Sequence, residues 1–101
     1  MESKLKDKNL DLLFEAVLTL ENVEECYSFF EDLCTIPELK EMSRRMTAAK
    51  MLRKNKVYSE IAELTGLSTA TISRVNRCIK YGNDGYNKAF ERLEAKEKNA
   101  E

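Results

Sequence analysis

The sequence contains no histidine and no tryptophan, and only 3 cysteines, 3 glycines and 1 proline among its 101 residues. Without histidine, the chain lacks the most common general base and the most common metal ligand of proteins. Cys26, Cys34 and Cys78 are odd in number and show no CxxC spacing, which argues against a zinc site and a disulfide framework. The glycines do not have the spacing of a GxGxxG or GxxxxGK loop. We therefore expect no metal, no cofactor and no enzymatic activity.

Long hydrophobic runs are also absent. No stretch approaches the roughly 18 apolar residues that cross a bilayer, and the first residues, MESKLKDKNL, lack the apolar core of a secretory signal. We expect a cytoplasmic protein without a membrane partner. A length of 101 residues suits one domain, residues 1–101, and a hydrophobic content of 43% is sufficient for a packed core.

The formal net charge is only −1, but the charge is distributed unevenly. Residues 1–35 carry 3 basic and 9 acidic side chains, residues 36–80 carry 10 and 4, and residues 81–101 carry 4 and 5. A basic middle suits an anionic partner at short range, where screening is weak. Solvated helix faces with uneven charge would give the same distribution, so charge alone does not identify a partner.

The scarcity of glycine and proline predicts an all-α chain of helices joined by short turns. Apolar residues recur at helical spacing in four segments outside residues 58–81. These stripes are Leu10, Leu13, Phe14, Val17 and Leu18; Val23, Cys26, Tyr27, Phe30, Leu33 and Cys34; Leu39, Met42, Met46, Ala49 and Leu52; and Tyr86, Ala89, Phe90 and Leu93. Cysteines on such a stripe are expected to be small buried hydrophobic residues rather than reactive thiols.

The helix boundaries and the assembly follow from local signals. Thr35 to Glu38 form a capping box, in which Pro37 is tolerated in the first turn. We expect the third helix to end near residues 54–56, and a C-terminal helix over residues 84–98 in which the tail EAKEKNAE frays. Residues 8–54 are expected to supply core and dimerisation helices, because their stripes exceed what a small monomer covers.

Residues 58–81, YSEIAELTGLSTATISRVNRCIKY, have the pattern of a helix-turn-helix. We expect helices over Tyr58–Thr65 and Thr69–Tyr81, separated by a turn in which Gly66 adopts a left-handed conformation. Ser68 can cap the second helix, whereas Val57 is a poor cap for the first and Ser59 is the alternative. The residues expected to lock the helix crossing are Ala62, which is small, and the apolar Ile61, Leu67, Ile72 and Val75.

An ordinary helical hairpin is the alternative to a DNA-binding unit. Against it stand the joint register of these positions and a run without acidic residues from Leu64 to Asn83. The second helix of a DNA-binding unit enters the major groove. We therefore interpret residues 58–81 as a unit that binds double-stranded DNA.

Helical geometry assigns roles on the second helix, whose core side should carry Ile72, Val75 and Ile79. The residues expected to contact base edges are Thr69, Ala70, Ser73 and Arg74, because the N-terminal end enters the groove first. The residues expected to contact phosphates are Lys54, Lys56, Tyr58, Ser59, Arg77 and Lys80. Arg74 could instead form an intramolecular ion pair, and Asn76, on the flank of the buried stripe, could have a structural role.

The chain resembles the Trp repressor superfamily, and more closely its YerC/YecD family. The resemblance covers nearly the whole chain and includes LFEAVLTL, VEECYSFFEDLCT, AAKMLR, EIAELTG, STATISRVNRC and YGNDGY. It implies a six-helix subunit, an intertwined homodimer with a helix-turn-helix at each end, and a role in bacterial transcription control as a repressor-like regulator. The resemblance to Trp repressor itself is concentrated in Leu52-Arg53 and in residues 70–74.

The resemblance also identifies a possible effector pocket. Trp repressor holds the indole of its corepressor between two arginines, which align with Arg44 and Arg74. Val75 stands where that pocket has a glycine, and Cys78 replaces a serine that helps to hold the amino group of the ligand. Because overpacking of this kind costs about 1–3 kcal/mol or more, we expect that tryptophan does not bind. A different anionic effector is left open by the two arginines.

The function expected from the sequence is therefore a homodimeric, sequence-specific DNA-binding transcriptional regulator that reads a two-fold symmetric operator. The alternative is a protein-interaction module that docks on the transcription machinery. An enzyme would need a paired catalytic constellation, and Glu60 and Glu63, which are close on one helix, are better explained as surface charges.

Overall fold

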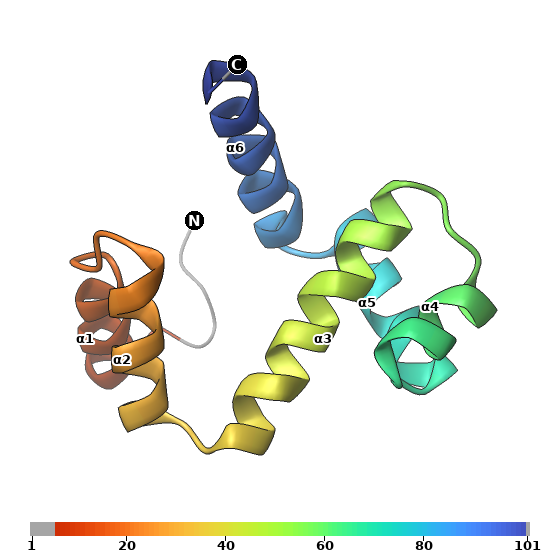
Figure 1. Cartoon of the computed structure of the whole chain (residues 1–101). Coiled ribbons are helices and arrows are strands. Elements are labelled where there is room, and N and C mark those ends of the chain that lie inside the picture. Colours follow the sequence, from red (N-terminus) through yellow and green to blue (C-terminus); the bar gives the residue numbers. More distant parts are fainter. Residues whose placement is uncertain (1–5, 101) are drawn as a thin grey trace. The chain divides into compact units, whose positions relative to one another are not determined.

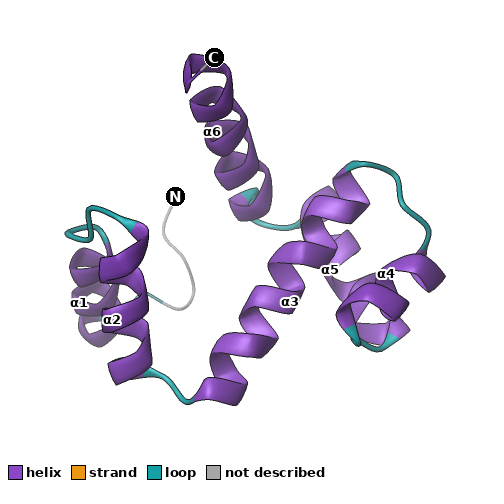
Figure 2. Ribbon diagram, viewed as in Figure 1, coloured by secondary structure: helices purple, strands orange, loops and turns teal. Residues whose placement is uncertain are grey.

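The computed structural model describes residues 6–100, which form six α-helices and no strand (Figure 1, Figure 2). The helices are α1 (Lys8–Val17), α2 (Val23–Leu33), α3 (Ile36–Arg53), α4 (Tyr58–Thr65), α5 (Thr69–Tyr81) and α6 (Gly85–Ala100). The predicted all-α, six-helix class is confirmed. The chain divides into two compact units, up to Leu39 and from Lys40 onward. Among the described helices, none has the length and hydropathy required to span a bilayer.

The first three helices begin at side-chain caps that satisfy free backbone N–H groups. Asp7 accepts a hydrogen bond from the N–H of Leu10 at 2.8 Å, and Asn22 caps α2 in the same way. The predicted capping box of α3 is confirmed: the Thr35 N–H donates to Glu38 Oε1 at 2.8 Å, and the Glu38 N–H donates to Thr35 Oγ1 at 3.3 Å. Hydrogen bonding of the Glu38 carboxyl group, first with the backbone N–H and then with the side chain of Thr35, lowers the pKa of Glu38.

The N-terminal unit has almost no interior of its own. No residue of α1 or α2 is buried, although three residues of each predicted stripe are partly covered. Large apolar side chains remain exposed in the single chain: Leu12, Phe14, Leu18, Val23, Tyr27, Leu33 and Ile36. These exposed side chains lie on or directly beside α1, α2 and the start of α3.

The core of the C-terminal unit consists of two clusters of buried side chains. One contains Ala48, Ile61, Leu67 and Ile72, and so joins α3 to α4 and α5. The other contains Ala49, Val75 and Phe90, and so joins α3 to α5 and α6. The predicted core positions Ile61, Leu67, Ile72 and Val75 are all buried.

Two methionines of the predicted α3 stripe are exposed in the single chain. Met42 and Met46, which the sequence predicts on the inner stripe of this helix, are 45% and 38% exposed. The interior position is taken by Ala48, which neighbours the predicted Ala49 and allows α4 and α5 to approach α3 closely. The small alanines at this crossing, rather than the long methionines, therefore form the inner surface of α3.

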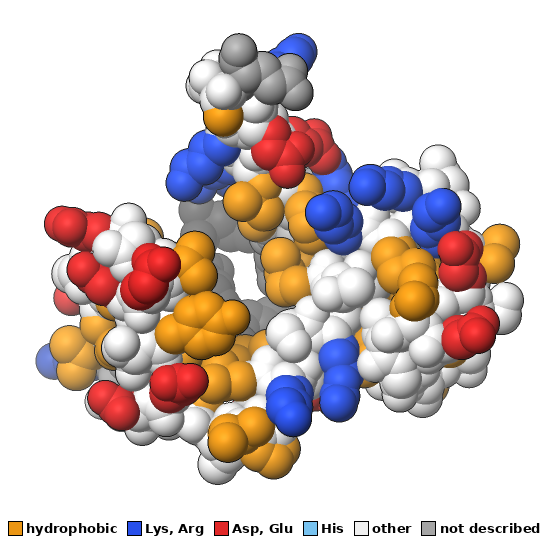
Figure 3. Space-filling view, viewed as in Figure 1, with side chains coloured by type: hydrophobic (Ala, Val, Ile, Leu, Met, Phe, Trp, Pro, Cys, Tyr) orange, Lys and Arg blue, Asp and Glu red, His pale blue; other side chains and the backbone are white. Residues whose placement is uncertain are grey.

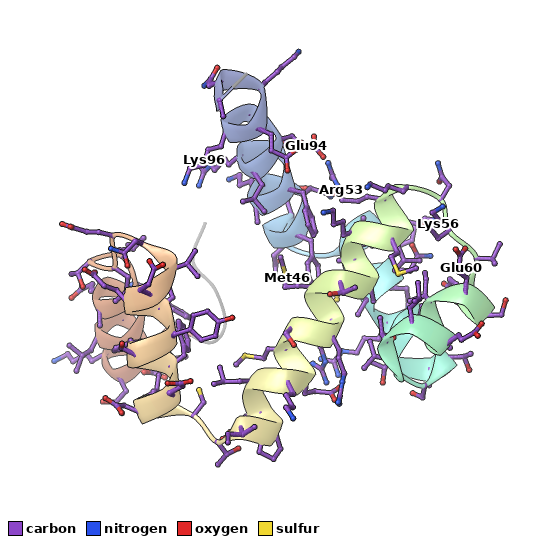
Figure 4. All side chains as sticks on the ribbon, viewed as in Figure 1. Met46, Arg53, Lys56, Glu60, Glu94 and Lys96 are labelled. Carbon is purple, nitrogen blue, oxygen red and sulfur yellow. The ribbon has the colours of Figure 1, made fainter. Side chains whose placement is uncertain are left out.

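A polar network at the end of α3 holds α6. Asn87 donates to the backbone oxygen of Ile79 at 2.9 Å and accepts from the Arg53 guanidinium at 2.7 Å. Arg53 also pairs with Glu94 at 3.0 Å and lies over the ring of Phe90, 5.4 Å from its centroid (Figure 4). The helix itself continues to Ala100, beyond the end that the sequence predicts and through the tail that it predicts to fray.

Candidate nucleic-acid interface

The two helices and the turn of the predicted helix-turn-helix are present with the predicted bounds, Tyr58–Thr65 and Thr69–Tyr81. Gly66 has a φ of 74°, in the left-handed region, and its N–H donates to the oxygen of Ala62 at 2.9 Å. A Cβ atom at Gly66 would meet nothing within 4 Å, so the backbone conformation, not lack of space, favours glycine here.

Thr65 stabilises the same turn and was not identified from the sequence. Its buried hydroxyl donates to the oxygen of Ile61 at 2.8 Å and accepts from the N–H of Leu67 at 3.2 Å. The hydroxyl therefore bridges the last turn of α4 and the first residue after Gly66. A threonine directly before a helix-ending glycine is the local signal that could have indicated this role.

The start of α5 is capped, whereas that of α4 is not. Ser68 Oγ accepts from the N–H of Thr71 at 3.1 Å, which confirms the predicted cap. Val57 provides no side-chain cap for α4, because its aliphatic side chain has no hydrogen-bond acceptor. Among the described residues, the hydroxyl of Ser59 does not take its place as a cap. The first N–H groups of α4 therefore lack a side-chain cap, and the exposed Lys54 and Lys56 shortly precede them in the sequence.

The side chains of α5 separate into an inner and an outer face. Ile72 and Val75 are buried and Ile79 is partly buried, as the helical geometry predicts. The outer face carries no acidic residue over the whole of α5. Its exposed residues are Thr69, Ala70, Arg74, Arg77, Cys78, Lys80 and Tyr81, with Ser73 partly covered. The structure thus presents all four residues expected at base edges on the accessible side of one helix.

Arg74 has no intramolecular partner among the described residues. The ion pairs within residues 6–100 are Lys6 with Asp11, Arg45 with Glu41, and Arg53 with Glu94. The exposed guanidinium of Arg74 is therefore available to an external acceptor. This placement favours a binding role for Arg74 over the alternative of an internal ion pair.

Four of the residues expected to contact phosphates lie between the end of α3 and the first turn of α4, whereas Arg77 and Lys80 lie on α5. Lys54 and Lys56 are exposed where α3 ends and the chain turns, a region of clustered basic side chains in Figure 3. Figure 4 shows Lys56 on this connection, while Glu60 lies on α4 itself. Tyr58 is partly buried and Ser59 is exposed. The basic side chains thus precede α4, and the acidic ones are confined to its outer side.

Val75, one of the four residues that the sequence assigns to a possible effector pocket, belongs to the core. Val75 is 3% exposed and packs with Ala49 and Phe90. Arg44 and Cys78 are exposed, and Cys78 lies on the wall of two shallow surface hollows, one of which Arg74 also lines. No three His, Cys, Asp or Glu side chains come together as a metal site within residues 6–100.

The fold and the exposed α5 define the class of the protein, a helix-turn-helix protein. A sequence profile described as Trp repressor protein matches residues 8–94. The chain is 51% identical over 94 residues to a protein named "Uncharacterized protein YerC" from Bacillus subtilis, covering 93% of this chain and 90% of the relative. The protein belongs to the Trp repressor family, and within it to the Trp-repressor-like YerC family.

Two solved structures share the fold. A TrpR-like protein from Eubacterium eligens superposes with a TM-score of 0.85 at 57% identity, covering 89% of this chain and 93% of that one. A candidate Trp repressor from Staphylococcus aureus also superposes with a TM-score of 0.85, at 49% identity over 90% of this chain and 91% of that one. The six-helix arrangement is therefore that of TrpR-like proteins.

Proposed function

We propose that the protein is a sequence-specific DNA-binding regulator of transcription in the bacterial cytoplasm, with α5 as its recognition helix. The observation that carries this proposal is the outer face of α5, which is exposed, free of acidic side chains and held from behind by buried Ile72 and Val75. A rigid helix with such a face fits the major groove. Membership of the Trp repressor family supports the same function.

The contacts divide by position along α5 and the segment before α4. Thr69, Ala70, Ser73 and Arg74 lie in its first half and contact base edges, where an arginine can bind O6 and N7 of guanine together. The phosphate contacts come from Lys54, Lys56, Tyr58, Ser59, Arg77 and Lys80. Residues 58–81 thus form the reading unit, and residues 84–98 of the C-terminal helix support it from behind through Phe90 and Asn87.

The functional unit in this proposal is a homodimer in which residues 8–54 provide the contact. The exposed apolar side chains of α1 and α2, and separately Met42 and Met46 of α3, lack cover in the single chain. A second copy supplies an apolar surface of the same kind, as two-fold symmetric dimers require. Two reading units related by this symmetry would contact half-sites about 34–36 Å apart.

Replacement of Arg74 by alanine should weaken binding to the preferred duplex by about 1–3 kcal/mol and broaden the sequence preference. The preferred duplex is obtained by selection from a random pool with the purified protein, and gel-shift titrations then compare the two proteins. Arg92→Ala, an equivalent change of an exposed residue on α6, is the matched control. Unchanged affinity and preference in the Arg74 variant, or selected duplexes without approximate two-fold symmetry, would contradict the assignment.

The regulator works without tryptophan as a corepressor in this proposal. Val75 fills the space beside Arg74 and contributes to the core of α3, α5 and α6, so the reading unit is set by the fold itself. The exposed Arg44, Arg74 and Cys78 leave room at the surface for another anionic effector.

Isothermal calorimetry should detect no binding of tryptophan at millimolar concentration, because the indole would have to displace the buried Val75 side chain. A Val75→Gly variant, checked for folding by circular dichroism, is the comparison in which that volume is removed. Micromolar affinity of the unaltered protein for tryptophan would overturn this prediction.

A second function, docking on a protein of the transcription machinery, is favoured by one observation. Leu64 on α4 and Val57 before it are 69% and 62% exposed. Apolar docking through these side chains would depend little on salt, whereas DNA binding depends on it strongly. The salt dependence of binding therefore distinguishes the two functions.

A further inference from the structure

One side-chain hydrogen bond connects the first residue of α4 with the middle of α5. Nδ2 of Asn76 donates to the hydroxyl oxygen of Tyr58 at 3.1 Å, across 18 residues of sequence. Both side chains are partly buried, and the Tyr58 ring packs against the cluster of Ala48, Ile61, Leu67 and Ile72. The core therefore fixes the ring, and Asn76 fixes the position of its oxygen.

The direction of this bond determines what the hydroxyl can do next. An amide NH2 group only donates, so the Tyr58 oxygen accepts from Asn76 and keeps its own proton. Within residues 6–100, no acceptor receives that proton. Because Tyr58 is only partly buried, its O–H group is free to donate to an acceptor outside the chain.

The position of Asn76 along α5 indicates what that acceptor is. Ser73 and Lys80 are three and four residues from Asn76, and side chains at these separations share a helix face. Ser73 is one of the residues expected to contact base edges, and Lys80 is one of those expected to contact phosphates. The Tyr58 hydroxyl therefore lies beside the part of α5 that leads from the base contacts to the phosphate contacts. The external acceptor at such a position is a phosphate oxygen of the DNA backbone.

We propose that Asn76 is a positioning residue that directs the Tyr58 O–H group to a DNA phosphate and thereby fixes how α5 sits in the groove. This inference rests on the proposed function, since it specifies one contact of the same interface. It separates Tyr58, which touches the phosphate, from Asn76, which acts through Tyr58. It also explains why a polar amide lies on the flank of a stripe that is otherwise apolar.

The test uses the full-length protein, its selected duplex, and the variants Tyr58→Phe, Asn76→Asp and the double variant. Tyr58→Phe removes the donor and should weaken binding about tenfold, the scale of one hydrogen bond to a charged group. Asn76→Asp offers an acceptor in place of the donor, so the Tyr58 proton turns inward and affinity falls. The added negative charge also lowers affinity. Comparison of the double variant with Tyr58→Phe measures this effect of charge alone, because the Tyr58 hydroxyl is absent from both.

The expected result is that Asn76→Asp weakens binding by a larger factor in the unaltered protein than in the Tyr58→Phe background. Equal factors in the two backgrounds would overturn the proposal. Thermal unfolding of each variant reports any general loss of structure. Tyr86→Phe, which removes the hydroxyl of a partly buried tyrosine on α6, is the matched control for the loss of a phenol oxygen.

A second measurement compares the two proteins in a way that depends on contact between the Tyr58 hydroxyl and a phosphate. Duplexes are prepared in which single phosphates are replaced in turn by uncharged methylphosphonates. At one position in each half-site, the replacement should weaken the unaltered protein but leave Tyr58→Phe unaffected; equal losses for both proteins at every position would overturn the contact. If the unaltered protein bound no selected duplex at all, the proposed function itself would fail, and that outcome is distinct from either of these.

Discussion

Raising the salt concentration from about 50 mM to about 200 mM should lower the affinity for duplex DNA by about four orders of magnitude. The reason is release of counterions from the phosphates that Lys54, Lys56, Arg77 and Lys80 neutralise. For a dimer these side chains neutralise about eight phosphates, and each contributes about −0.9 to the slope of log affinity against log salt. A slope of about −7 over a fourfold change in salt gives a factor of about 10⁴.

The measurement is a titration of a fluorescently labelled duplex at several salt concentrations, followed by anisotropy. Lys54→Ala should reduce the slope by about one unit for each subunit and weaken all sequences alike. Lys96→Ala on α6 replaces a lysine outside the proposed contact set and provides the matched control (Figure 4). A slope near zero for the unaltered protein would instead support apolar docking of α4 on a protein partner.

Replacement of Ile61 by alanine should lower the free energy of unfolding by about 2–5 kcal/mol, the cost of a cavity at a fully buried aliphatic side chain. Ile61 is 0% exposed and lies in the cluster that joins α3 to α4 and α5. Because this cluster positions α5, a loss of this size should also reduce DNA binding at temperatures near the unfolding midpoint.

Leu64→Ala provides a comparison on the same helix. Leu64 is three residues further along α4 and is 69% exposed, so its truncation should change stability by no more than about 0.5 kcal/mol. Urea denaturation followed by circular dichroism measures both variants. Similar losses for Ile61→Ala and Leu64→Ala would mean that α4 packs with a different face than the structure shows.

The helix-turn-helix could be predicted from the sequence to the residue because its determinants are local. Gly66 ends α4, Ser68 caps α5, and the apolar spacing of Ile61, Leu67 and Ile72 fixes the crossing, all within 24 consecutive residues. Backbone preferences and caps act over a few residues, so a single sequence displays them.

Contacts between distant residues were not visible in the same way. The bond from Asn76 to Tyr58 and the network of Asn87 with Arg53 depend on how α3, α4, α5 and α6 meet. Spacing alone places Met42 on an apolar stripe of the third helix, and such a stripe does not state whether its own chain or another one covers it. The base and phosphate assignments on α5 remain predictions for the same reason, since they depend on a partner molecule.

The burial of Val75 has a consequence for how such a regulator would be controlled in a cell. In the proposed function, a protein that completes its core with its own valine needs no tryptophan to become competent for DNA binding. Occupancy of its sites would then follow the number of copies of the protein, and synthesis and degradation would set the output. Regulation of this kind would respond on the time scale of cell growth and protein turnover, which is far slower than the binding of a small-molecule corepressor.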